Sequence, residues 1–220
     1  MRGGHPFLKQ VGKFLGVMET EAKKRNAPVF MLEGRSGGSP FRILVYTMLS
    51  ARTRDDATIG AAERLFAKYS STREIANADE GEIEELIYPV GFYRAKARHL
   101  KKMCRMLDSD YGGNVPRTLN GLTSLPGVGL KIANIVLARA FGKNTIGVDT
   151  HVHRISNRLG IIRTGKPQDS SIMLNRKIPA KYRTKFNRTF VGFGQTVCKP
   201  VRPLCAGCPV AKACKRVGVR

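Results

Sequence analysis

Apolar residues recur at helical spacing along most of this chain, and runs of alternating apolar residues are scarce. The stripe between Phe41 and Leu49 is the clearest case, because its apolar residues fall three or four positions apart, as on one face of a helix packed against a core. Ser39 supplies an N-cap and Pro40 a first helical position. The pattern predicts an all-α fold.

Six further helices are predicted by the same pattern, and glycines mark where several of them end. Their approximate ranges are 56–68, 82–87, 94–107, 130–141, 149–159 and 182–193. The predicted stops are Gly142, Gly160 and Gly194. The helix at 130–141 is apolar almost all round, so we expect it to be largely buried.

The helix at 94–107 has an apolar face and a basic face. Its apolar face carries Ala97, Leu100, Cys104 and Leu107, so the basic residues are expected to form the outer face. Cys104 is therefore predicted to be a core residue.

The charge of the chain is strongly positive, with 39 Lys and Arg against 16 Asp and Glu, or +23. Such an excess implies an anionic partner, most simply nucleic acid, with general solubility or nonspecific polyanion binding as the alternative. The distribution of the acids is uneven. Asp149 is the only carboxylate between Asp110 and Asp169, and no carboxylate follows Asp169.

From the sequence we expect neither a transmembrane helix nor a secretory signal peptide. No uncharged apolar run approaches the roughly 20 residues that a transmembrane helix needs. The stretch from Arg2 to Lys13 contains no apolar core of a signal peptide. We therefore expect an intracellular protein, in the cytoplasm with the nucleoid, or in the nucleus of a eukaryote. Disulfides are not expected in such a reducing compartment.

A glycine turn, Leu125-Pro-Gly-Val-Gly129, precedes the apolar helix. Glycine permits a positive φ and a close backbone approach, and a helix N-terminus presents unpaired N–H groups to an anion. A DNA phosphate is one candidate for that anion, and a plain helix–helix turn is the alternative.

Lys131 lies in the first turn of this helix, where the helix dipole, basic neighbours and partial burial disfavour the ammonium form. A lysine of this kind is either a nucleophile or a phosphate contact.

The isolated Asp149 follows eighteen residues later in the segment VDTHVHR. It is a candidate partner for a lysine, and an ordinary N-cap is the alternative. His151 and His153 are ligand or acid–base candidates, but a supporting or phosphate-contacting role is favoured.

Four of the five cysteines, Cys198, Cys205, Cys208 and Cys214, lie in a C-x6-C-x2-C-x5-C pattern. Four thiolates this close together indicate a metal site in a reducing cell. Spacing alone does not separate zinc from an iron–sulfur cluster, although zinc sites usually pair two C-x2-C units and only one is present. Lys199 and Arg202 lie in the first loop of the pattern, where they would meet a phosphate backbone.

Two segments, LPGVGLKIANIVLARAFG and TIGVDTHVHRISNRLG, closely resemble the helix–hairpin–helix DNA glycosylases of the endonuclease III family. The resemblance extends upstream to FRILVYTMLSARTRDDA and PVGFYRAKA and downstream to the cysteines, and so covers roughly residues 30–216. It implies that Lys131 is the catalytic lysine and Asp149 the catalytic aspartate. It also implies a [4Fe-4S] cluster on the four cysteines and a hairpin at Leu125, Gly127, Val128 and Gly129 that binds DNA.

The resemblance further implies two helical domains flanking a cleft. Residues 33–143 would form a six-helix barrel with the hairpin, and residues 1–32 together with 144–220 would form the iron–sulfur cluster domain. The partner would be double-stranded DNA with a damaged base or an abasic site, and the protein a monomer. Lysine attack at C1′, followed by β-elimination 3′ of the site, would remove an oxidised pyrimidine.

Arg52 departs from the family pattern, which commonly has glutamine at this position, associated with the gap that a flipped base leaves. Arginine could fill that gap and hydrogen-bond the orphaned base, or it could contact a phosphate.

Two other functions of the protein stay open. One is a mismatch or adenine glycosylase of the same architecture, and the other is a noncatalytic DNA-binding module with a structural metal. For the cysteine cluster itself we expect a structural and DNA-positioning role, with redox sensing as the alternative.

Overall fold

The structure is a computed structural model that describes residues 5–219. Within these residues all regular secondary structure is helical, which confirms the predicted all-α class. The elements are α1 (Pro6–Lys9), α2 (Val11–Lys24), α3 (Pro28–Arg35), α4 (Pro40–Leu49), α5 (Asp55–Lys68), α6 (Thr72–Asn77), α7 (Glu80–Ile87), α8 (Tyr93–Tyr111), α9 (Leu119–Thr123), α10 (Leu130–Phe141), α11 (Thr150–Leu159), α12 (Pro167–Lys177), α13 (Ala180–Thr196) and the 3-10 helix η1 (Ala211–Ala213).

The chain divides into two compact units. The central unit is Leu32–Phe141, and the terminal unit combines the described parts of Met1–Met31 and Gly142–Arg220. The central unit therefore contains α4 to α10, and the terminal unit contains α1, α2 and α11 to α13. Among residues 5–219, every helix is too short or too polar to span a membrane.

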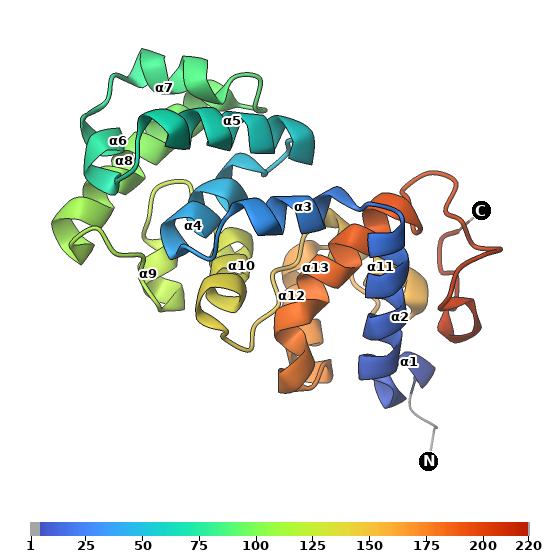
Figure 1. Ribbon diagram of the computed structural model, residues 1–220. Helices are drawn as coiled ribbons and strands as arrows, with labels where there is room; N and C mark the ends of the chain where they lie inside the picture. The colour runs from blue at the N-terminus through green and yellow to red at the C-terminus, as the bar shows by residue number, and fades with distance from the viewer. Residues whose placement is uncertain (1–4, 220) are drawn as a thin grey trace. The chain divides into compact units, whose positions relative to one another are not determined.

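The central unit is built around two sets of packed helices. Helix α4 packs against α10, and α8 packs against α6 and α7, with α5 alongside α7 (Figure 1). Side chains from these helices share one apolar core, whose fully buried members include Leu44, Leu65, Ile83, Leu100 and Ala133. Burial of this apolar surface is the main force that holds the helices together. Cys104 is fully buried in the same core, as predicted, and burial raises the pKa of its thiol.

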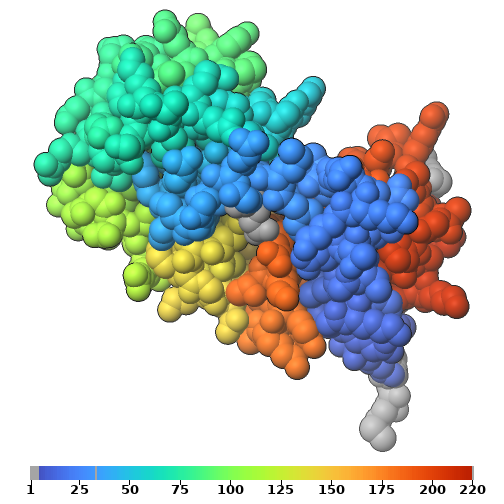
Figure 2. Space-filling view, in the orientation of Figure 1, coloured from blue at the N-terminus to red at the C-terminus, as the bar shows by residue number. Residues whose placement is uncertain are grey.

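The terminal unit joins the two ends of the sequence. Helix α2 packs along α13, and α11 packs on the same helix. Figure 1 shows α2 in blue and α13 in orange, and Figure 2 shows the blue surface of the N-terminal helices in the same orientation. Phe186 and Phe190 stack with ring centroids 4.0 Å apart, and Phe7 meets Phe190 edge-on. Glu19 of α2 forms an ion pair with Arg188 of α13. The N-terminal helices are thus part of the core formed by the C-terminal helices.

The predicted boundaries of α10 and α11 are confirmed, as is the predicted start of α4. The predicted end of α8 and the predicted bounds of α13 are wrong, because α8 continues to Tyr111 and α13 begins at Ala180. Ser39 caps α4 by accepting the Arg42 N–H, and Gly160 ends α11 in the left-handed conformation. Gly194, however, lies inside α13, which continues to Thr196. A Cβ on Gly194 would lie 2.4 Å from Nδ1 of His151. This glycine therefore permits the close packing of α13 against α11 and does not end a helix.

Candidate functional site

The glycine turn joins α9 to α10 in the central unit. Gly127 has a φ of +80°, and a Cβ there would lie 3.0 Å from the Cβ of His99 on α8. Both the backbone conformation and the close approach of His99 therefore require glycine. Gly127 and Gly129 are exposed. Leu125 and Val128 bury their side chains in the core, so only their backbone groups are available to a ligand.

Lys131 is the second residue of α10, the helix that the turn introduces. Its side chain is half-buried, whereas the apolar residues that follow it are buried as predicted. The positive end of the helix dipole and the exposed backbone of the turn lie at this end of α10. The central unit therefore holds an amine beside a helix N-terminus that is suited to anions.

A second lysine, Lys96 of α8, lies near Lys131 and was assigned by sequence to the basic outer face. That assignment is wrong, because Lys96 is only 8% exposed. Its ammonium donates to the backbone oxygens of Leu49 and Ala51, both at 2.6 Å, and to Oγ1 of Thr53 at 3.0 Å. Burial, together with the nearby charge of Lys131, lowers the pKa of Lys96 to about 8. Lys96 lies four positions before the buried Leu100 and so on the same face of α8, and this spacing was the sequence signal that could have predicted its burial.

Arg52 lies on the exposed turn between α4 and α5. Its backbone is left-handed, with a φ of +54°. Its guanidinium carbon is 5.7 Å from the centroid of the Phe92 ring. Phe92 is itself 64% exposed and left-handed, and it precedes α8. An open pocket adjoins this turn, lined among others by Arg52, Thr53 and Gly91.

Asp149 belongs to the terminal unit, where it is the N-cap of α11 as predicted. Its Oδ1 accepts the backbone N–H of Val152 at 2.9 Å. The carboxylate is half-buried, and the charge of Arg154 acts in its neighbourhood. Asp149 is therefore both an N-cap and a negatively charged group. The cap bond uses Oδ1, which leaves Oδ2 as an acceptor for a catalytic role.

The two histidines of α11 contact other protein groups. Nδ1 of His153 is 2.6 Å from Oγ of Ser170, and Nδ1 of His151 is 3.1 Å from Nη2 of Arg154. These contacts tie α11 to its surroundings, which agrees with the favoured supporting role.

The four cysteines of the C-terminal pattern line a single cavity of the terminal unit. Cys198, Cys205, Cys208 and Cys214 surround it together with apolar side chains such as Phe193. Within the described residues, no three His, Cys, Asp or Glu side chains converge closely enough to hold one metal ion. Burial raises the pKa of the Cys208 and Cys214 thiols. Four separated sulfurs around a cavity fit a group larger than a single ion, such as an iron–sulfur cube with one cysteine on each iron.

Arg158 of α11 holds the first loop of this cysteine site, and sequence reasoning missed it. Its guanidinium donates to Sγ of Cys198 at 3.5 Å and to the carbonyl oxygens of Lys199 and Pro200 at 2.6 and 2.8 Å. Lys199 and Arg202 of the same loop are exposed. The loop is therefore fixed from inside and presents two cations to solvent.

The sequence matches the family model of the HhH-GPD superfamily base excision DNA repair proteins over residues 45–180. Endonuclease III of Thermotoga maritima is 44% identical over 80% of this chain and 83% of that protein, and the Bacillus subtilis endonuclease III is 38% identical over 80% and 81%. The chain spans about half the length of two Arabidopsis thaliana endonuclease III homologues, 47% and 48%.

Solved structures agree with these sequence matches. A trapped endonuclease III–DNA covalent intermediate, an estranged-adenine complex, shares 33% identity and a TM-score of 0.82 over 95% of this chain and 96% of that chain. A thermostable thymine-DNA glycosylase shares 26% identity and a TM-score of 0.73 over 88% and 96%. The chain therefore belongs to the HhH-GPD superfamily of base excision DNA repair proteins, as a relative of endonuclease III.

Proposed function

We propose that Lys131 is the nucleophile of this base excision DNA glycosylase and AP lyase. The observation that carries the proposal is the placement of a half-buried lysine in the first turn of α10, directly after the glycine turn. A helix N-terminus attracts the phosphates of DNA, so the amine lies where a nucleotide is held. A related endonuclease III has been trapped as a covalent intermediate with DNA, which supports a nucleophile on the protein.

The reaction follows from an amine attacking the sugar of a nucleotide that has been flipped out of the duplex. Nζ of Lys131 bonds to C1′, and the bond to the damaged base breaks, with its electron pair and a proton going to the base. The amine loses its proton and the sugar ring opens, which gives a Schiff base. Loss of a C2′ proton then expels the 3′ phosphate oxygen and cuts the strand, and water releases the lysine.

Asp149 supplies the carboxylate of this reaction. It either takes a proton from the attacking amine or stabilises the positive charge that develops on the sugar. Its isolation in the sequence supports a dedicated role, since phosphate binding needs no carboxylate there. The N-cap bond to Val152 uses Oδ1 and fixes the orientation of the group.

Double-stranded DNA with a damaged base or an abasic site is the proposed partner. Backbone groups of the Leu125–Gly129 turn bind phosphate on one side of the lesion, and Lys199 with Arg202 bind it from the cysteine loop. Arg52 faces the base opposite the lesion. An oxidised pyrimidine is the proposed target, and a monomer acting in the cell compartment that holds DNA is the proposed state.

A [4Fe-4S] cluster is the proposed occupant of the four-cysteine cavity. Each cysteine would bind one iron, and the cluster, when bound, would supply a rigid anchor for the loop that carries Lys199 and Arg202. Arg158 holds the same loop from the protein side. Iron and sulfide analysis of the purified protein tests this assignment, and a colourless protein that carries zinc contradicts it.

Borohydride trapping on a duplex with one abasic site tests the nucleophile. The unchanged protein should give a covalent adduct, and Lys131→Ala should give none. Lys101→Ala is the matched control, because Lys101 is a second half-buried lysine of the central unit, and it should still form the adduct. An adduct that survives Lys131→Ala rules out Lys131, and the absence of any adduct from the unchanged protein rules out the lyase. A panel of single-lesion duplexes, scored separately for base release and strand cleavage, tests the proposed target.

A further inference from the structure

Lys96 uses all of its hydrogen-bonding capacity at one place in the central unit. A lysine ammonium has three N–H donors, and three acceptors surround this one, on Leu49, Ala51 and Thr53. Two of these acceptors are backbone oxygens at and just beyond the end of α4, whose last residue is Leu49. The end of a helix leaves such carbonyls without helical partners and carries a partial negative charge. Lys96 therefore closes the C-terminal end of α4 from another helix.

The charge environment of Lys96 makes this a costly arrangement. The interactions that set its pKa are burial and the positive charge of Lys131, both of which disfavour the ammonium. Burial of a cation costs free energy unless its hydrogen bonds are satisfied. An apolar side chain would fill this position without that cost, so packing alone does not account for a lysine. What the ammonium supplies is the fixed geometry of the backbone it holds.

That backbone is the turn that carries Arg52. Ala51 and Thr53, which both accept from Lys96, flank Arg52 directly. Oγ1 of Thr53 also accepts the N–H of Gly91 at 3.1 Å. A Cβ on Gly91 would lie 2.6 Å from the carbonyl oxygen of Arg52. The turn is therefore held on both sides of Arg52 and pressed against the segment before α8.

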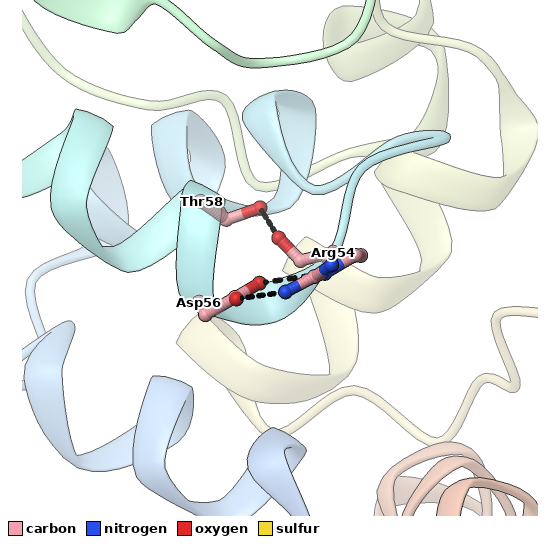
Figure 3. Close-up of polar contacts among 3 residues, drawn as sticks. All are labelled: Arg54, Asp56 and Thr58. Carbon is pink, nitrogen blue, oxygen red and sulfur yellow. Dashed lines mark hydrogen bonds and ion pairs between the residues drawn. The ribbon is translucent and has the colours of Figure 1, made fainter.

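The following residues are fixed in the same way, as Figure 3 shows. Thr58 donates to the carbonyl oxygen of Arg54 at 3.0 Å, and the Arg54 side chain pairs with Asp56 through Nε and Nη2. Arg52 itself has a φ of +54°, a left-handed conformation that is strained for a residue with a side chain. The surrounding hydrogen bonds maintain that conformation and leave the guanidinium exposed.

We propose that Lys96 is a positioning residue, which fixes the Ala51–Thr53 turn and thereby sets how Arg52 meets the base opposite the lesion. The inference rests on the proposed function, in which Arg52 faces that base. Lys96 acts through the backbone of the turn, and it contacts no DNA because its ammonium is occupied and buried. Removing the ammonium should therefore change the same property as removing the Arg52 side chain.

The test is a double-mutant cycle on binding to duplexes with a tetrahydrofuran abasic analogue opposite each of the four bases. Lys96→Met should reduce the affinity ratio between the best and worst opposite base on the order of tenfold, as Arg52→Ala should, since a bidentate contact to a base contributes discrimination of that size. In the Arg52→Ala background, Lys96→Met should change the ratio little, because residues that act through one another are not additive.

Arg105→Met is the matched control. Arg105 lies on the same helix and donates to the carbonyl oxygen of Ala76 on α6, so this variant removes a cationic side chain from a backbone acceptor elsewhere. It should leave the opposite-base ratio unchanged. A merely structural role of Lys96 predicts that Lys96→Met lowers stability but preserves the ratio, and additive effects of Lys96→Met and Arg52→Ala also overturn the inference.

Two further variants decide the question if Lys96→Met does not fold. Thr53→Val removes one acceptor of Lys96, and Gly91→Ala forces the Arg52 carbonyl to move. Both should lower the opposite-base ratio, and a ratio that neither changes overturns the inference. Borohydride trapping by the unchanged protein distinguishes a failure of the proposed function from a failure of the role inferred for Lys96. No adduct rejects the proposed function, whereas an adduct together with an unchanged ratio rejects only the role of Lys96.

Discussion

Asp149 accepts the backbone N–H of Val152 through Oδ1 at 2.9 Å, and so begins α11. The same carboxylate is the proposed partner of Lys131 in the reaction. One residue is therefore assigned two tasks, a local one that needs only a hydrogen-bond acceptor and a chemical one that needs a negative charge. Substitutions that keep one property and remove the other separate the two tasks.

Asp149→Asn should keep the stability of the protein but lose its activity. Asparagine is an N-cap about as good as aspartate, whereas alanine forfeits about 1 kcal/mol. Denaturant unfolding should therefore place Asp149→Asn near the unchanged protein and Asp149→Ala about 1 kcal/mol below it. Base release should fall about 10²- to 10⁴-fold in both variants, because general acid–base contributions have that size. Full activity of Asp149→Asn excludes a chemical role for the carboxylate.

The local signals of the sequence predicted the helices that carry these residues. Ser39 before Pro40 begins α4, Asp149 begins α11, and Gly160 ends it. Each signal depends only on a backbone group within a few residues. The apolar periodicity around Lys131 predicted α10 for the same reason, since a helix face is defined by its own neighbours.

Contacts between distant segments were not predictable in this way. Gly194 looked like a helix stop, but His151 lies against it, and that contact joins positions 43 residues apart in the sequence. Lys96 looked like one more member of a basic face, but its acceptors are carbonyl oxygens of another helix and its turn. Residue type alone does not reveal a buried cation when the partners are backbone groups. The short helices, such as α9, have too few residues to show a period.

Two helical glycines of the terminal unit should respond to alanine in opposite directions. In α13, a Cβ on Gly194 meets His151 and Arg154, so Gly194→Ala should destabilise the protein by about 1–3 kcal/mol. In α2, a Cβ on Gly16 meets nothing within 4 Å, so Gly16→Ala should stabilise it by about 0.5–1 kcal/mol. Thermal or denaturant unfolding of both variants checks the pair. Equal effects of the two substitutions would show that α13 does not need the close approach.

Arg158→Met should loosen the loop between Cys198 and Cys205. The variant loses the donors to Sγ of Cys198 and to the carbonyl oxygens of Lys199 and Pro200, each worth about 1 kcal/mol or more. We expect a several-fold loss of affinity for undamaged duplex DNA and faster bleaching of visible absorbance in the iron-loaded protein.

The control for Arg158 is Arg163→Met, which removes the same charge from an exposed position of the same unit. It should lower DNA affinity only through its charge and leave bleaching unaffected. Equal bleaching rates in the two variants would mean that Arg158 does not hold the cysteine loop.

Because the pKa of Lys96 is lowered in the folded protein, the free energy of unfolding should vary with pH in the alkaline range. Lys96 titrates near 10.5 in the unfolded chain and at about 8 in the folded protein. Between these values the unfolded chain binds one more proton than the folded protein, so the free energy of unfolding rises with pH across this window. Lys96→Met has no such proton. The stability of the unchanged protein relative to Lys96→Met should therefore increase between pH 8 and pH 10, by up to about 3 kcal/mol.

Denaturant unfolding at pH 7, 8, 9 and 10 measures this difference, and groups common to both proteins cancel in it. Lys131→Met tests the contribution of the neighbouring charge to the pKa of Lys96, because it removes the like charge that acts on Lys96. The pKa of Lys96 should then rise, and the window should begin at a higher pH and become narrower. Burial is the larger cause of the lowered pKa, so the window should narrow without closing. A difference that does not change with pH in the unchanged protein would show that Lys96 keeps its ordinary pKa when buried.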